Sequence, residues 1–86
     1  MELERINVVT RDEYREAQEP TGFEWKGNHY RVAQVLDRWY EGHMSASRLP
    51  LRYFKVRTQD GGIFILRYHE LFRAWSLLVS RESADE

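Results

Sequence analysis

The sequence predicts a mostly β fold, namely a small antiparallel sheet that is strongly bent or rolled into a partly open barrel of five to six strands. Three observations favour this fold class. Bulky β-branched and aromatic residues alternate with polar ones in several segments, as in half-buried strands. Turn signals that contain glycine separate these segments, the strongest being Asp60-Gly61-Gly62. Aromatics make up 14% of the 86 residues, and each buried ring removes about 150–250 Å² from water, so a short chain can still form a core.

The N-terminal segment predicts one short strand followed by a polar loop. Residues 6–9, Ile-Asn-Val-Val, are rich in β-branched side chains and are expected to form the first strand. Thr10 and Glu13 have the spacing of a capping box, so a short helical turn near residues 11–18 is an alternative to the loop. Nucleating such a turn without an apolar face is costly. The sequence assigns no role to the acidic stretch at residues 12–19.

A hairpin is predicted next, with strands at residues 21–27 and 28–42 that meet at Gly27-Asn28. The apolar alternation shifts phase in the second strand, which predicts a β-bulge near Ala33-Gln34 and a bend. A helix is the competing interpretation for residues 32–40, because apolar residues there also recur at helical spacing. We favour the strand, because β-formers dominate and no capping residue opens a helix.

A second hairpin is expected after a small polar loop at residues 42–50. Its strands are residues 51–59 and 63–69, and the Asp-Gly-Gly turn at residues 60–62 joins them. Asp-Gly and Gly-Gly pairs are typical of tight hairpin turns, because glycine adopts positive φ without a steric penalty. The hairpin is therefore the best-defined local structure in the sequence.

The end of the chain is ambiguous by periodicity, because residues 70–80 fit either a strand or a helix. Residues 80–86 are polar and are expected to be a frayed end of a single domain that covers residues 1–86. Alternation along the predicted strands directs one set of side chains to a common core: Val8, Phe23, Trp25, Tyr30, Val32, Val35, Phe54, Val56, Phe64, Leu66, Trp75 and Leu77.

The opening motif resembles a known family. Residues 20–39 read P-x-x-F-x-W-K-G-x-x-Y-x-V-x-x-V-L-x-x-W, and the chain continues with Y-x-K-V-R-T, an Asp-Gly-Gly turn and a closing W-x-L. Over residues 20–79 it is similar to a group of small bacterial proteins of unknown function. The resemblance implies a strand for residues 73–79 and implies no activity. The acidic stretch at residues 12–19 looks like an insertion relative to that pattern.

Composition excludes several kinds of chemistry. The chain has no Cys, which rules out disulfides and thiolates and is compatible with a cytoplasmic protein. It has no apolar run long enough for a signal peptide or a membrane span, so we expect no membrane association. The three His are scattered, and no Ser, carboxylate or Gly-rich motif has catalytic or phosphate-binding spacing. We therefore expect neither catalytic residues, nor a metal, nor a cofactor.

The charge pattern favours a binding role. Residues 21–75 carry nine cations and five acids between acidic ends, although the whole chain has a net charge of −1. We expect a non-catalytic interaction module that binds a protein or a second copy of itself through a sheet edge and exposed aromatic and basic residues. The alternative is a small β-barrel that binds single-stranded nucleic acid. The candidate partner-binding residues are Lys26, Arg31, Arg38, Trp39, Tyr40, Tyr53, Lys55, Arg57 and Arg67.

Overall fold

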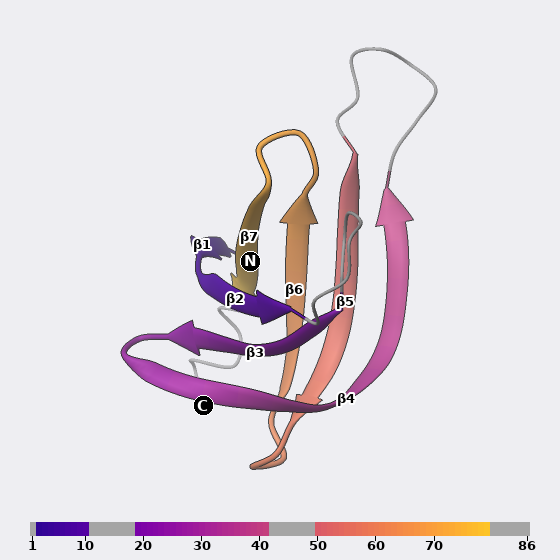
Figure 1. Ribbon diagram of the computed structural model, residues 1–86. Helices are drawn as coiled ribbons and strands as arrows, with labels where there is room; N and C mark the ends of the chain where they lie inside the picture. The colour runs from indigo at the N-terminus through magenta and orange to yellow at the C-terminus, as the bar shows by residue number, and fades with distance from the viewer. Residues whose placement is uncertain (1, 11–18, 42–49, 80–86) are drawn as a thin grey trace.

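The computed structural model describes residues 2–10, 19–41 and 50–79, which form one antiparallel sheet (Figure 1). The fold of these residues is all-β, and the sheet curls strongly into a half-barrel, as the sequence predicts. Neighbouring strands follow the order β1-β7-β6-β5-β4-β3-β2. The seven strands are β1 (Glu2–Arg5), β2 (Asn7–Thr10), β3 (Pro20–Trp25), β4 (Asn28–Glu41), β5 (Leu51–Thr58), β6 (Ile63–His69) and β7 (Ala74–Val79).

Strand β4 belongs to both layers of the half-barrel, because it is long and bent. Its residues 28–31 pair with β3, whereas residues 32–41 pair with β5. Two register shifts leave Ala33 and Leu36 without a partner on β5. Bulges of this kind bend a strand, and Figure 1 shows β4 passing from the layer of β2 and β3 to the layer of β5, β6 and β7. The bulge predicted near Ala33-Gln34 is confirmed, and the bulge at Leu36 is additional.

The two edge strands of the sheet, β1 and β2, follow each other directly in the chain. Strand β1 pairs with β7 and β2 pairs with β3, and only Ile6 lies between them. The backbone N–H of Ile6 donates a hydrogen bond to the carbonyl oxygen of Trp75 at 3.2 Å. The sequence predicts one first strand at residues 6–9, but the chain is already extended at residue 2 and turns a corner at Ile6. This corner raises the number of strands to seven.

The turn between β3 and β4 consists of Lys26 and Gly27, because Trp25 pairs with Asn28 across it. The sequence prediction, Gly27-Asn28, was one residue too late. Both turn residues have positive φ, 53° for Lys26 and 78° for Gly27. Two consecutive residues with positive φ match the right-handed twist of the flanking strands, so this geometry closes the hairpin without splaying it.

The other sequence-based expectations also have clear outcomes. The β5–β6 hairpin is confirmed, and Thr58 N donates to Gly62 O at 2.8 Å across its turn. The final apolar segment is a strand, β7, and it pairs with β6 and β1. The possible helical turn near residues 11–18, the loop at residues 42–49 and the tail at residues 80–86 lie outside the described residues. Among the described residues, none belongs to a helix with the length and apolar character needed to cross a membrane.

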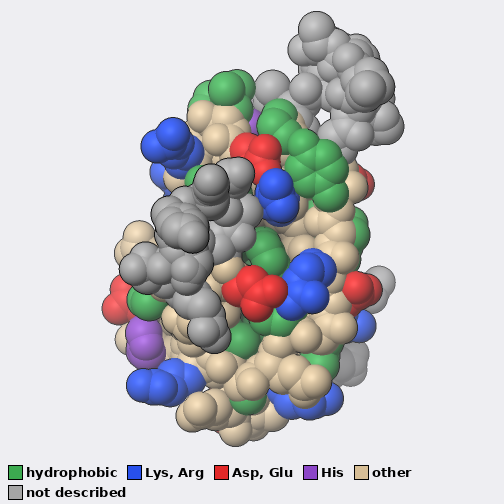
Figure 2. Space-filling view, turned by 45° about the vertical axis from the view of Figure 1, so that its right-hand side comes forward, with side chains coloured by type: hydrophobic (Ala, Val, Ile, Leu, Met, Phe, Trp, Pro, Cys, Tyr) green, Lys and Arg blue, Asp and Glu red, His purple; other side chains and the backbone are tan. Residues whose placement is uncertain are grey.

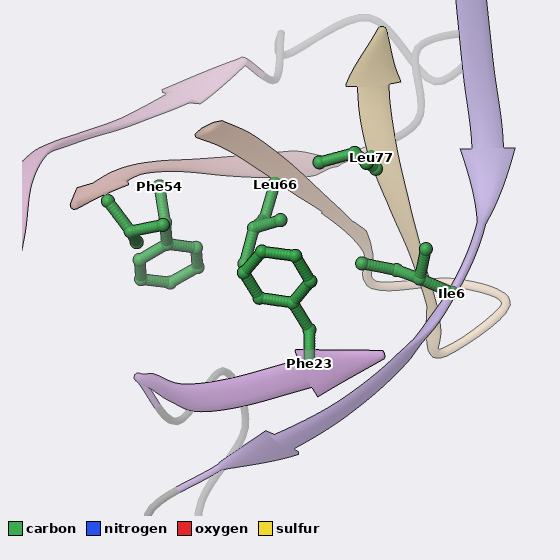
Figure 3. Packing of buried hydrophobic residues seen from close by; sticks show 6 residues of the cluster. Ile6, Phe23, Phe54, Leu66 and Leu77 are labelled. Carbon is green, nitrogen blue, oxygen red and sulfur yellow. The ribbon is translucent and has the colours of Figure 1, made fainter. Parts of the chain in front are cut away.

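The core lies between the two layers. Figure 3 shows Phe23 from the β3 layer pointing at Leu66 from the β6 layer, with Phe54 and Leu77 at the sides. Phe23 has no exposed surface, and its ring stacks on Tyr30 with 5.1 Å between centroids. Five of the twelve predicted core residues belong to the buried cluster, and the other seven are partly buried and pack against it. Ile6 also belongs to the cluster, and Val79 also packs against it.

Candidate interaction surface

Cross-strand register determines which candidate residues share a face. Residues that are directly opposite in an antiparallel pair point to the same side of the sheet. The buried residues Phe54, Val56 and Leu66 mark the concave, core-facing side. The convex side of β4, β5 and β6 therefore carries the residues that alternate with them. Five of the nine candidate residues lie together on this convex face: Trp39, Tyr53, Lys55, Arg57 and Arg67.

An unbroken row of basic, polar and aromatic side chains crosses the convex face. Arg5 pairs with Ser76, Ser76 with Arg67, Arg67 with Tyr53, and Tyr53 with Trp39. The row crosses β1, β7, β6, β5 and β4 at right angles to the strands. At about 4.8 Å between neighbouring strands, it is about 19 Å long. It contains no acidic residue, and we call it the basic–aromatic row.

The aromatic end of the row is a stacked pair. The Trp39 and Tyr53 rings lie 5.1 Å apart at an interplanar angle of 3°, and Trp39 is 39% exposed. The Tyr53 hydroxyl donates a hydrogen bond to Glu41 Oε1 at 3.0 Å. Burial, followed by the hydrogen bond and negative charge of Glu41, raises the pKa of Tyr53 above its usual value, and Arg67 opposes this shift. The stack is therefore a fixed platform with one outer ring face open.

Arg67 lies at the centre of the row and has an unsatisfied donor. Its Nε atom is buried, and none of the described residues accepts a hydrogen bond from it. A buried donor without an acceptor costs free energy, and a charged donor costs more than a neutral one. The positive charge of the Arg67 guanidinium, which is only partly buried, would attract an acidic group that approached this row.

A second row on the same face is partly apolar. Leu3 pairs with Leu78 and Leu78 pairs with Ile65, two residues along the strands from the basic–aromatic row. Leu3 is 45% exposed. Lys55 and Asp37 continue this row across β5 and β4. The convex face thus has an apolar row beside a basic one, and we call the Leu3, Leu78 and Ile65 part the apolar row.

The other four candidate residues do not join this face. Lys26 is in the β3–β4 turn, with its ammonium 5.0 Å from the Trp25 ring centre. Arg31 is exposed on the first half of β4. Arg38 and Tyr40 lie on the concave side, opposite Phe54 and Arg52 respectively. The bulge at Leu36 reverses the facing of the residues after it, so Arg38 points to the concave side and Trp39 to the convex side.

The sheet edge that was expected to mediate association is protected against pairing with another strand. Beyond Arg31, no other described strand pairs with the second edge of β4. Two bulges interrupt this edge, and Arg38 N donates to the Asp37 carboxylate at 2.8 Å. Bulges and charged side chains are common protections against edge-to-edge pairing in natural sheets. Only the short stretch after Arg38 remains regular, so the convex face offers more binding area than the edge.

A pocket of about 260 Å³ opens on the concave side of the upper part of β4 and β5. Two ion pairs flank it, Arg38 with Glu19 at 2.5 Å and Arg52 with Glu70. Figure 2 shows acidic and basic side chains side by side in two places on one face, with hydrophobic side chains between them. The pocket is lined by Glu19, Arg38, Trp39, Tyr40, Arg52, Tyr53 and Phe54.

A larger, polar hollow of about 560 Å³ lies beside the β5–β6 turn, and His29, Arg31 and Asp60 are among its lining residues. Asp60 accepts hydrogen bonds from the Thr58 hydroxyl and from Gly62 N, which lower its pKa below the usual value. The Asp60 carboxylate is therefore held by hydrogen bonds within the β5–β6 turn. Within the described part of the chain, no group of three or more His, Asp or Glu side chains could hold a metal ion.

Fold and surface together define a small all-β half-barrel domain with a basic–aromatic row on its convex face. The chain belongs to the family described as "Domain of unknown function (DUF6504)", whose model matches residues 3–82. This confirms the expected membership of a family without an assigned function. Searches of the curated proteins and of the solved structures found no match.

Proposed function

We propose that this protein is a non-catalytic interaction module that binds a partner protein through its convex face. The observation that carries the proposal is the basic–aromatic row, which combines an exposed Trp, a stacked Tyr and two Arg without an acid between them. Trp, Tyr and Arg are the residues most often responsible for binding energy at protein interfaces. The adjoining apolar row supplies area that a partner can remove from water.

The chemistry of the face favours an acidic partner segment over a second copy of the chain. The convex face carries the cations Arg5, Lys55, Arg57 and Arg67 against the acids Asp37 and Glu41. Two such faces packed against each other would bring like charges together, which is destabilising. A partner segment with acidic side chains beside apolar ones would complement both rows. Its carboxylates would also pair with the positive charge of the Arg67 guanidinium.

A selection experiment tests this proposal without knowledge of the natural partner. A random library of peptides displayed on phage is selected on the immobilised wild-type protein, and the best peptides are synthesised. We expect peptides rich in acidic and apolar residues whose affinity falls about tenfold or more when Arg67 is replaced by Ala, as for loss of a charge-assisted hydrogen bond. Arg31→Ala is the matched control, because Arg31 is exposed but lies on the part of β4 that pairs with β3, away from the row across β4, β5 and β6.

Two results would contradict the proposal. One is that no peptide binds above background. The other is that the selected peptides bind the Arg67→Ala and wild-type proteins equally well. Light scattering of the free protein separates self-association from partner binding, because a concentration-dependent dimer that buries the convex face would favour the second copy as the occupant.

Single-stranded nucleic acid is the second candidate, and the Trp39–Tyr53 platform next to Arg67 is the observation that favours it. Bases stack on aromatic rings and phosphates pair with Arg and Lys. However, the two rings cover each other, so only the outer face of Trp39 is open to a base. Titration with oligo-dT at two salt concentrations tests this alternative. Each phosphate contact contributes a slope of about −0.7 in the logarithm of affinity against the logarithm of salt.

A further inference from the structure

The concave pocket between the two ion pairs has the size and lining of a single-ring site. Its volume of about 260 Å³ exceeds the roughly 150 Å³ cavity that holds benzene in an engineered protein core. Phe54 is 4% exposed and forms an apolar floor. Tyr40 is 54% exposed on the same side of the sheet and forms a wall. An aromatic ring in this space would contact one ring below and one beside it.

The two arginines at the pocket differ in how firmly they are held. Arg52 is bound on two sides, because its guanidinium pairs with Glu70 and lies 5.3 Å from the Tyr40 ring centre. Arg38 pairs with Glu19 alone among the described side chains, and both of these side chains are about half exposed, at 54% and 46%. Ion pairs between exposed side chains contribute little to stability. A ligand carboxylate can therefore replace Glu19 on Arg38 at a small cost.

We propose that this pocket binds an aromatic ring that carries a carboxylate, with the ring on Phe54 and Tyr40 and the carboxylate on Arg38. Glu19 then acts as an internal competitor for the guanidinium. The ligand is either a small aromatic acid or the C-terminal carboxylate of a chain that ends in an aromatic residue. Trp39 and Tyr53 line both this pocket and the convex row, but the groups proposed to hold the ligand, Arg38, Tyr40 and Phe54, face the concave side, so the proposal does not depend on the protein-binding role.

The probe is phenylacetate, with phenylacetamide as its neutral counterpart of the same shape. Both are titrated into the uniformly labelled protein, and the amide signals of Tyr40 and Phe54 are followed by NMR. We expect saturable shifts at these residues, with phenylacetate bound about threefold to tenfold more tightly than phenylacetamide, because only the acid forms a charge-assisted hydrogen bond. N-acetyl-Gly-Phe and its C-terminal amide, titrated in parallel, distinguish a peptide end from a small molecule as the source of the carboxylate.

Three variants separate the roles of the lining residues. Arg38→Gln should reduce the affinity for phenylacetate to that for phenylacetamide. Glu19→Gln should raise the affinity for phenylacetate about twofold to fivefold, in keeping with the strength of an exposed ion pair, and leave phenylacetamide unchanged. Tyr40→Ala should weaken the two probes equally. Arg31→Gln is the control for a cation on the same strand outside the pocket, and it should change neither probe.

The proposal is wrong if phenylacetate binds no more tightly than phenylacetamide, or if its shifts map outside the pocket. It is also wrong if neither probe gives saturable shifts at millimolar concentration. An Arg38→Gln protein that keeps full affinity for phenylacetate would likewise overturn it. All of the substituted side chains are exposed, so unfolding of the variants does not confuse these outcomes.

Discussion

Replacing Phe23 by Ala should remove a large part of the stability of the fold. Phe23 has no exposed surface, and its ring contacts Tyr30 in a stacked pair and Phe64 edge-on at 5.2 Å. A buried Phe→Ala change costs about 3–5 kcal/mol, and loss of two aromatic contacts moves the expected cost to the upper part of that range. A chain of 86 residues has a free energy of unfolding of about 4–13 kcal/mol at about 0.05–0.15 kcal/mol per residue.

The assay is urea unfolding followed by tryptophan fluorescence, with thermal unfolding alongside. Trp25 and Trp75 pack against the core, so their emission reports its loss. We expect Phe23→Ala to lower Tm by about 16–40 °C, since the cost of about 4–5 kcal/mol corresponds to about 4–8 °C per kcal/mol in a domain of this size. The matched control is Phe72→Ala, because Phe72 is 67% exposed and stacks on His69, so its free energy of unfolding should fall by about 1.5 kcal/mol or less. Equal stability of the two variants would refute the two-layer packing around Phe23.

Three further expectations concern single groups. The pKa of Tyr53 is raised in the folded protein, so Tyr53 contributes its full share of stability below its unfolded pKa and loses it as the pH rises through its folded pKa. Glu41→Gln should lower the folded pKa of Tyr53. Phenolate absorbance, with Tyr53→Phe as the reference, measures this change. The pKa of Asp60 is lowered in the folded protein, so the pH dependence is reversed: Asp60 contributes stability above its unfolded pKa and loses it as the pH falls through its folded pKa. Thr58→Val should return the Asp60 pKa toward 3.8, as followed by a carbon-detected NMR titration. Arg73→Asn should raise the free energy of unfolding by about 0.5–1 kcal/mol, because Arg73 has a φ of 53° and Asn tolerates this region better than Arg; an unchanged or lower Tm would contradict this.

Most of the fold could be predicted because local sequence determines it. The Asp-Gly-Gly turn and the alternation on each side of it define β5 and β6, and tight turns set the register of the strands they join. The bulge near Ala33 was also visible, because the apolar alternation shifts there. Strand β1 was not predicted, since Glu2–Arg5 contains a single apolar residue. One of its acids, Glu4, faces the core side and accepts a hydrogen bond from Trp25 Nε1 at 2.9 Å, a contact between distant parts of the chain.

The candidate surface was only half visible in the sequence. Alternation within one predicted hairpin is enough to bring Tyr53, Lys55 and Arg67 to one face. The other end of the basic–aromatic row could not be found, because Arg5 and Ser76 join it through the pairing of the first strand with the last. The Leu36 bulge could not be predicted, because Leu36 is itself apolar and leaves the alternation ambiguous.

A charge exchange between protein and peptide tests the role of the convex face most directly. An acidic peptide selected on the wild-type protein is compared with a version in which Lys replaces each acidic residue, and both are titrated against wild type and Arg67→Glu. If Arg67 meets a partner carboxylate, the acidic peptide should lose affinity for Arg67→Glu and the Lys peptide should gain it, whereas Arg31→Glu should behave like wild type. Equal binding of the acidic peptide to wild type and Arg67→Glu would contradict the account.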